Sequence, residues 1–253
     1  MAAGLHYLLT FLPPLPGLGE APPITLEEVG RLAGEIPGRE IRALFELIQL
    51  EDTLRDLVGS RLHLPGVAGQ PAPDPGSLPP TLAAMFGEAA ADQTEEVWLT
   101  EVMDRFYRHV AERGRSLGSP LLTLWAGWER ALRWQMAATR ARNLAEEAPV
   151  PSGGGQPGGS FCQGPVAPPP DQGLDPAIDH TALIQEACMA QDPLAAELVL
   201  DEGRARFLEE QAVRYSFRIE ELIAYILKLR LLLRHARLNR AEGIKILQEV
   251  TSV

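Results

Sequence analysis

A nearly unbroken apolar run at residues 217–234 constrains this chain more than any of its polar motifs. The run reads FRIEELIAYILKLRLLLR, and its Leu and Ile residues leave little of a helix circumference polar, a pattern typical of a central rather than a surface helix. A membrane span is the competing interpretation. However, Lys228 and Arg230 interrupt the run, whereas a span needs roughly 20 largely uncharged residues. We therefore expect a central helix of the C-terminal core, enclosed by other helices.

Composition narrows the choice of partners and compartment. The net charge of −11 argues against nucleic-acid binding, because neutralising phosphates needs clustered Lys and Arg. Two cysteines, Cys162 and Cys188, are too few for a disulfide framework and indicate a reducing compartment. The apolar segment 5–12 lacks a preceding basic region and is followed by Pro13, so it does not resemble a signal peptide. We expect a cytoplasmic protein with no nucleic-acid partner and no membrane span.

Helix signals recur along the chain. Thr25 and Glu28 have the spacing of a capping box, and Ser119 followed by Pro120 predicts the start of a long helix that reaches Glu147. Apolar spacing and turn residues predict further helices at about 39–59, 94–114, from 175, from 192, through the run above and at 240–250. The one extended segment that we expect is 5–12, where bulky apolar residues alternate.

These elements predict an all-α fold, a multi-helix bundle of stacked helical hairpins with a short extended N-terminal segment. Residues 149–174 are rich in Gly and Pro and cannot bury enough apolar surface to offset the entropy of ordering, so we interpret them as a flexible linker. The linker divides the chain into an N-terminal helical region, 1–148, and a C-terminal helical region, 175–253, that packs on the first.

Polar motifs give no support for catalysis. His180 lies near Asp179, Glu186 and Cys188, but none of these falls at the three- or four-residue spacing that would pair it with His180 on one helix face. We interpret it as part of an exposed helix start. The sequence contains no P-loop, dinucleotide fingerprint, nucleophile elbow or Cys-x-x-Cys pair. The prediction is a protein that is not an enzyme, with no catalytic residue, cofactor or metal, although carboxylates from distant positions could still assemble a site.

The apolar run ends in a cluster of cations, Lys228, Arg230, Arg234 and Arg237. One interpretation is solvation together with complementarity to the helix dipole, since cations are favoured near a helix C-terminus. The other is a basic surface that binds an acidic partner and orients an assembly. These four residues are the candidate partner-binding site.

Three parts of the sequence resemble a known family. The opening LHYLLTFLPPL at 5–15, followed by PPITLEE at 22–28, resembles the start of a bacterial family of V-type ATPase-associated proteins, whose members begin with a Tyr-Tyr-Leu-x-x-x-Leu-Pro-like run. Residues 219–230 and 243–248 resemble its closing helices and, more distantly, those of the C (or d) subunit of V/A-type ATPases. Residues 124–144 resemble its middle helix, except that Trp134 stands where the family pattern has Asn.

The resemblance implies a non-catalytic subunit that couples the central stalk of a V/A-type ATPase to its membrane rotor ring, in ATP-driven or ATP-producing ion transport, including proton transport. The fold that it implies is C/d-subunit-like and all-helical. The partners would be other stalk and ring subunits, and the protein would associate peripherally with the inner membrane through that complex. The alternative is a helical adaptor or regulatory protein with an unrelated protein partner.

Overall fold

The computed structural model describes residues 2–63, 73–87, 94–147, 178–190 and 192–237. All regular structure within these ranges is helical, and no strand occurs there. The all-α prediction is therefore confirmed for the described residues. The α-helices are α1 (Ala2–Phe11), α2 (Leu26–Gly34), α3 (Arg39–Arg61), α4 (Pro80–Ala83), α5 (Glu95–Ser116), α6 (Pro120–Glu147), α7 (Thr181–Cys188), α8 (Pro193–Ala212) and α9 (Ile219–Arg237), and two 3-10 turns, η1 (Pro75–Ser77) and η2 (Ala84–Phe86), flank α4.

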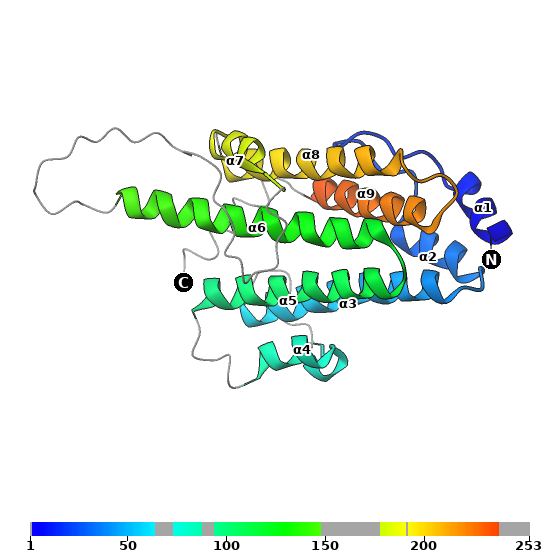
Figure 1. Ribbon diagram of the computed structural model, residues 1–253, viewed down its shortest axis with the longest axis horizontal. Coiled ribbons are helices and arrows are strands. Elements are labelled where there is room, and N and C mark those ends of the chain that lie inside the picture. The colour runs from blue at the N-terminus through cyan, green and yellow to red at the C-terminus, as the bar shows by residue number, and fades with distance from the viewer. Residues whose placement is uncertain (1, 64–72, 88–93, 148–177, 191, 238–253) are drawn as a thin grey trace, which may run out of the picture.

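Two hairpins form the body of the molecule. Helices α5 and α6 run side by side, connected by residues 117–119, and α8 and α9 form the second pair (Figure 1). Helix α3 packs on both α5 and α9, while α7 packs on α6 and α8. Helices α1 and α2 close one end of the bundle, where both contact α9 (Figure 1).

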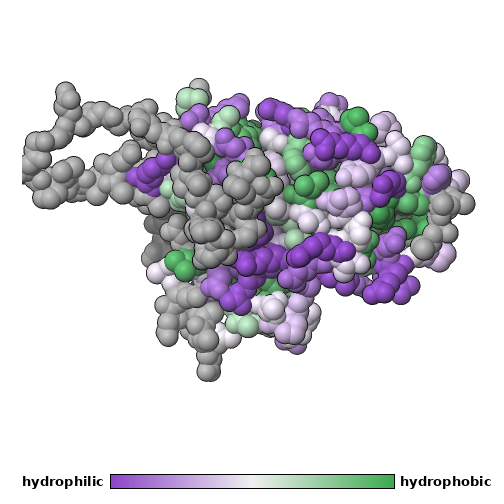
Figure 2. Space-filling model, in the orientation of Figure 1, coloured by the Kyte–Doolittle hydropathy of each residue, from purple (hydrophilic) through white to green (hydrophobic). Residues whose placement is uncertain are grey.

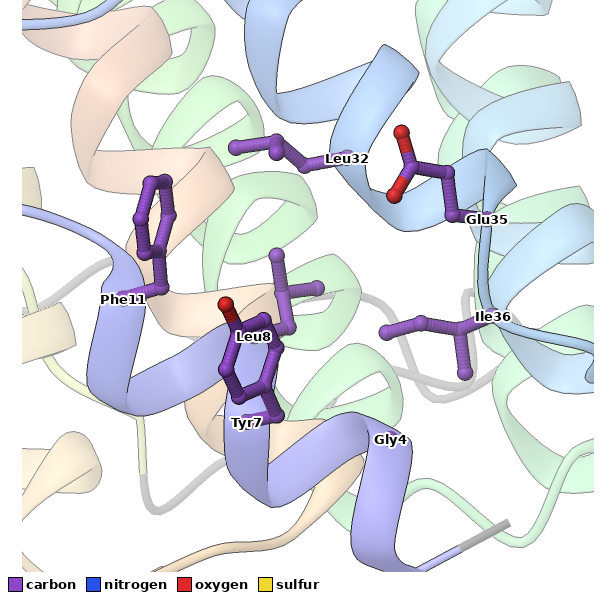
Figure 3. A pocket seen from close by; sticks show the side chains of 7 residues that line it. All are labelled: Gly4, Tyr7, Leu8, Phe11, Leu32, Glu35 and Ile36. Atoms are coloured by element: carbon purple, nitrogen blue, oxygen red, sulfur yellow. The ribbon is translucent and has the colours of Figure 1, made fainter.

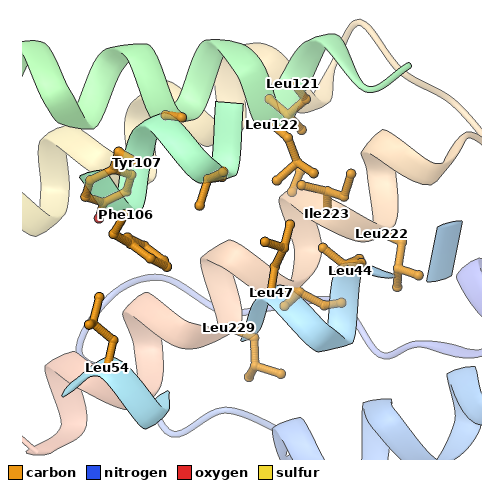
Figure 4. Packing of buried hydrophobic residues seen from close by; sticks show 14 of the residues in the cluster. Leu44, Leu47, Leu54, Phe106, Tyr107, Leu121, Leu122, Leu222, Ile223 and Leu229 are labelled. Carbon is orange, nitrogen blue, oxygen red and sulfur yellow. The ribbon is translucent and has the colours of Figure 1, made fainter. Parts of the chain in front are cut away.

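Helix α9 contributes to two hydrophobic clusters formed by the described residues. Leu222, Ile223, Ile226 and Leu229 of its first half lie in the larger cluster, with side chains from α1 to α6. Figure 4 shows Leu222, Ile223 and Leu229 beside residues of α3, α5 and α6. Leu231, further along, lies in a smaller cluster formed with α6, α7 and α8. The sequence predicted α9 as the centre of the C-terminal core, and the structure gives it the N-terminal helices as neighbours too.

The helix starts follow the capping chemistry expected from the sequence. The Thr25 hydroxyl accepts a bond from the Glu28 backbone N–H, and the Glu28 carboxylate accepts one from the Thr25 N–H, which completes the predicted capping box. The Ser119 hydroxyl accepts from the Leu122 N–H at the start of α6. The predicted starts of both helices are thereby confirmed.

The extended conformation predicted for residues 5–12 is wrong. Residues 2–11 form α1, with Leu8 and the following Leu12 only 3% and 8% exposed, four residues apart on the face that packs into the core. A short apolar run does not distinguish a strand from a buried helix by periodicity alone, and here the four-residue spacing is satisfied. The helix ends just before Pro13 and Pro14, which cannot continue its hydrogen bonding.

Some predictions fall outside the described residues. They are the linker at 149–174, the start of the C-terminal region at 175–177 and the last helix at 240–250. No helix in the described part of the chain is long and apolar enough to cross a membrane.

Candidate docking surface

The cations predicted to bind a partner reach carboxylates of their own chain. Lys228 lies 2.7 Å from Glu209 of α8, and Arg230 lies 3.2 Å from Glu51 and 3.0 Å from Asp52, both on α3. Arg230 is mostly buried, and Glu51 and Asp52 raise its pKa although burial would lower it. The first two predicted site residues therefore hold α9 against α8 and α3.

Arg234 joins a network of ion pairs that crosses the bundle. Its guanidinium contacts Glu197 and lies 2.5 Å from the Asp201 carboxylate, and Asp201 is in turn 2.9 Å from Arg204 within α8. Arg204 also lies 2.7 Å from Glu129 of α6. Arg237 is the last residue of α9, and its side chain is not among those described. A partner-binding role for the four cations stays a prediction, but Lys228, Arg230 and Arg234 are already engaged within the chain.

The two buried carboxylates of this network have opposite pKa shifts. Burial would raise the pKa of Glu129, but Arg204 and Arg133 together lower it by more, so it stays ionised. At Asp201, which is fully buried, the effect of burial outweighs Arg234 and Arg204, and the pKa is raised. Each carboxylate is bound to guanidinium groups, an arrangement that suits cohesion between helices α6, α8 and α9.

His180 is buried rather than part of an exposed helix start. Its side chain is 5% exposed, its Nε2 lies 3.1 Å from the Trp128 carbonyl oxygen, and its ring meets the Trp128 indole edge to face. The Gln135 side chain accepts a hydrogen bond from the His180 N–H and donates one to the Ile178 carbonyl. Two backbone polar groups of the segment before α7 thereby have hydrogen-bond partners. Burial lowers the pKa of His180. The residue that could have indicated this burial is Gln135 of α6, because its side-chain amide bonds the segment before α7.

Among the described residues, no three His, Cys, Asp or Glu side chains gather in a way that could hold a metal ion. Asp179, which neighbours His180, accepts bonds from the Thr181 N–H and hydroxyl at the start of α7. Hydrogen bonding to Thr181 lowers the pKa of Asp179. The polar groups around His180 are thus held by local structure.

The end of the bundle that carries α1 exposes aromatic side chains. Tyr7 is 72% and Phe11 58% exposed, and their rings stack with centroids 6.1 Å apart, whereas Leu8 between them is buried. Beside them is a hollow of about 360 Å³ between α1 and the end of α2 (Figure 3). Its lining consists of Gly4, Tyr7, Leu8, Phe11, Leu32, Glu35 and Ile36.

Gly4 permits the close approach of the two walls of the hollow. A Cβ atom on Gly4 would lie 3.2 Å from the Cγ2 atom of Ile36, tighter than ordinary van der Waals contact. The absence of a side chain therefore lets α1 lie directly against the residues that follow α2. Hydrophobic colouring in Figure 2 gathers at this same end of the molecule.

The loop between α8 and α9 extends the exposed apolar surface. Phe217 is 48% exposed, and its ring lies 4.8 Å from the His6 ring of α1. Its backbone has a φ of +56°, a left-handed conformation that is strained for an aromatic residue, and its N–H donates to the Glu221 carboxylate at 2.6 Å. We call Tyr7, Phe11, Phe217 and the hollow the aromatic end. Sequence reasoning missed it, because exposed and buried apolar residues look alike in one sequence.

Comparisons with models of protein families, with curated proteins and with solved structures found no match for this chain.

Proposed function

We propose that this chain is a non-catalytic subunit of a V/A-type ATPase that couples the central stalk to the membrane rotor ring, and that the aromatic end contacts its partners. The observation that carries the docking role is the exposure of Tyr7 and Phe11 at a hollow at one end of a helical bundle, with the exposed Phe217 ring beside α1. Clustered exposed apolar side chains mark interaction sites, because hydrating them is unfavourable. The choice of ATPase rests on the resemblance of residues 5–15, 22–28, 124–144, 219–230 and 243–248 to that family.

The internal ion pairs suit a mechanical role. Glu129, Arg204, Asp201 and Arg234 connect α6, α8 and α9 through contacts of 2.9 Å or less, so these helices resist sliding past one another. A subunit that transmits torque needs such lateral cohesion more than it needs a reactive group. In this proposal the subunit is C/d-like, and it associates with the membrane only through the rest of the complex.

A tagged pull-down from gently solubilised membranes of the source organism, read by mass spectrometry, tests the proposal. Wild-type bait should recover rotor and stalk subunits of a V/A-type ATPase in comparable amounts. The double variant Tyr7→Ser with Phe11→Ser should lose them. Val97→Ser, which changes another exposed apolar residue on α5, should retain them. Folded wild-type bait that recovers none of these subunits would overturn the proposal and favour an adaptor with an unrelated partner.

A further inference from the structure

We infer that the hollow between α1 and the end of α2 binds a basic amphipathic helix of a partner protein, with an apolar side chain in the hollow and a Lys or Arg facing Glu35. The inference deepens the proposed function, on which it rests for the identity of the assembly, by stating the chemistry of the partner segment. Three features of the described residues carry it: the size and lining of the hollow, its charge, and the secondary structure around it.

The size and lining suit apolar side chains. Five of the seven lining residues are apolar or aromatic, Tyr7, Leu8, Phe11, Leu32 and Ile36, and the volume of about 360 Å³ lies at the lower end of the range for ligand pockets. That space admits one or two Leu- or Phe-sized side chains rather than a cofactor. Filling it would cover the exposed faces of Tyr7 and Phe11, and thereby remove apolar surface from water.

The charge of the wall favours a basic partner. Glu35 is the one carboxylate in the lining, and Figure 3 shows it turned toward the hollow. Its ion pair with Arg31 is long, 3.6 Å, with side chains 67% and 69% exposed, so it is weak and readily exchanged. The segment 20–36 contains four carboxylates and one Arg, so its net charge is negative. The stacked rings of Tyr7 and Phe11 add faces that attract a cation.

The surroundings favour a helix as the bound element. Both walls are helical or follow directly from a helix, and the described residues offer no strand edge to which an extended peptide could add. An amphipathic helix places apolar anchors three or four residues apart on one face, and a cation one turn away from an anchor lies on the same side. This geometry matches an apolar hollow with a carboxylate on its wall.

A display library of helical peptides, each about four turns long, tests the inference even while the partner protein is unidentified. Peptides are selected on the full-length protein and counter-selected on the Tyr7→Ser, Phe11→Ser variant. We expect the enriched peptides to combine Leu or Phe with Lys or Arg on one face. Enrichment of acidic or uncharged peptides, or of none that discriminate against the variant, would overturn the inference.

Binding of a selected peptide, followed by fluorescence anisotropy, isolates the role of Glu35. Glu35→Lys should weaken the complex about tenfold, because it replaces an attraction with a repulsion of like charges. Glu27→Lys is the matched control, since Glu27 is an exposed carboxylate on α2 outside the lining, and it should change the affinity less than about twofold. Equal effects of the two variants would contradict a specific contact. Failure here would leave the pull-down of ATPase subunits intact, so the two proposals fail separately.

Discussion

The cations of α9 and the exposed rings of the aromatic end differ in whether they have partners within the chain. Along α9, Lys228, Arg230 and Arg234 each reach carboxylates of other helices in the same chain. At the aromatic end, Tyr7 and Phe11 stack on each other and remain largely exposed. A cluster of charges that looks ready for a partner can thus serve internal cohesion, while apolar side chains left in water indicate where a partner would gain most by binding.

The largest effect on stability should come from breaking the ion-pair network between α6, α8 and α9. Arg204→Met leaves the buried carboxylates of Glu129 and Asp201 without their shared guanidinium, and we expect a loss of about 3–5 kcal/mol in the free energy of unfolding. Urea denaturation followed by circular dichroism measures it. Arg31→Met, which breaks the exposed pair with Glu35, should cost less than about 1 kcal/mol. Similar losses in the two variants would contradict the distinction between buried and exposed pairs.

The two faces of α1 should respond differently to truncation. Leu8→Ala removes a buried side chain of the larger cluster and should cost about 2–5 kcal/mol of unfolding free energy. Tyr7→Ala changes an exposed residue one position away and should stay within about 0.5 kcal/mol of wild type. Thermal unfolding of both variants compares them. A destabilised Tyr7→Ala protein would mean that the aromatic end contributes to folding rather than to binding.

Acidification should weaken the contact between α6 and the segment before α7. Because burial places the folded-state pKa of His180 below its ordinary value of 6.5, the unfolded chain takes up the proton first as the pH falls. The stability of the wild type should therefore decline below about pH 6.5, by at most about 1.4 kcal/mol per pH unit for this one group. His180→Gln keeps a donor for the Trp128 carbonyl and does not titrate.

Unfolding free energies of wild type and His180→Gln between pH 8 and pH 5 test this expectation. The advantage of the wild type should be greatest near pH 8 and should narrow on acidification. Burial also lowers the pKa of His109, which is common to both proteins and cancels in the difference. A difference that does not change with pH would exclude a buried neutral His180.

The smallest effect concerns the strained residue of the aromatic end. Phe217→Gly and Phe217→Ala both remove the ring that meets His6, but only Gly adopts a positive φ without strain. We expect the Gly variant to be more stable than the Ala variant by about 1 kcal/mol. Parallel urea denaturation measures this difference. If both variants bind partners poorly while remaining folded, the ring itself contributes to binding.

Helix positions were largely predictable because their signals are local. Capping residues such as Thr25 and Ser119, and apolar spacing in 94–114 and 217–234, depend only on neighbours a few residues away. Segment 5–12 was misread because a short, largely apolar stretch fits either period. The short α4 also lacked a signal, as it is a single turn within a Pro-rich region.

The candidate site was not predictable, because exposure and ion pairing depend on the tertiary structure. Nothing local distinguishes Tyr7, which is exposed, from Leu8, which is buried. Likewise, the carboxylates that pair with Arg230 come from a distant part of the chain, with a separation of 178 residues for Asp52. One sequence shows which charges are present but not which opposite charges they reach.

The place of α9 in both hydrophobic clusters has a consequence for synthesis on the ribosome. Helices α1 to α6 contribute most of the larger cluster, yet the Leu222 and Ile226 side chains that complete it are synthesised only after all of these helices. Until then the apolar faces of these helices have no central partner, and such partly folded chains are prone to aggregate. We expect nascent chains that stop before residue 219 to recruit chaperones, and chains released beyond residue 237 to shed them.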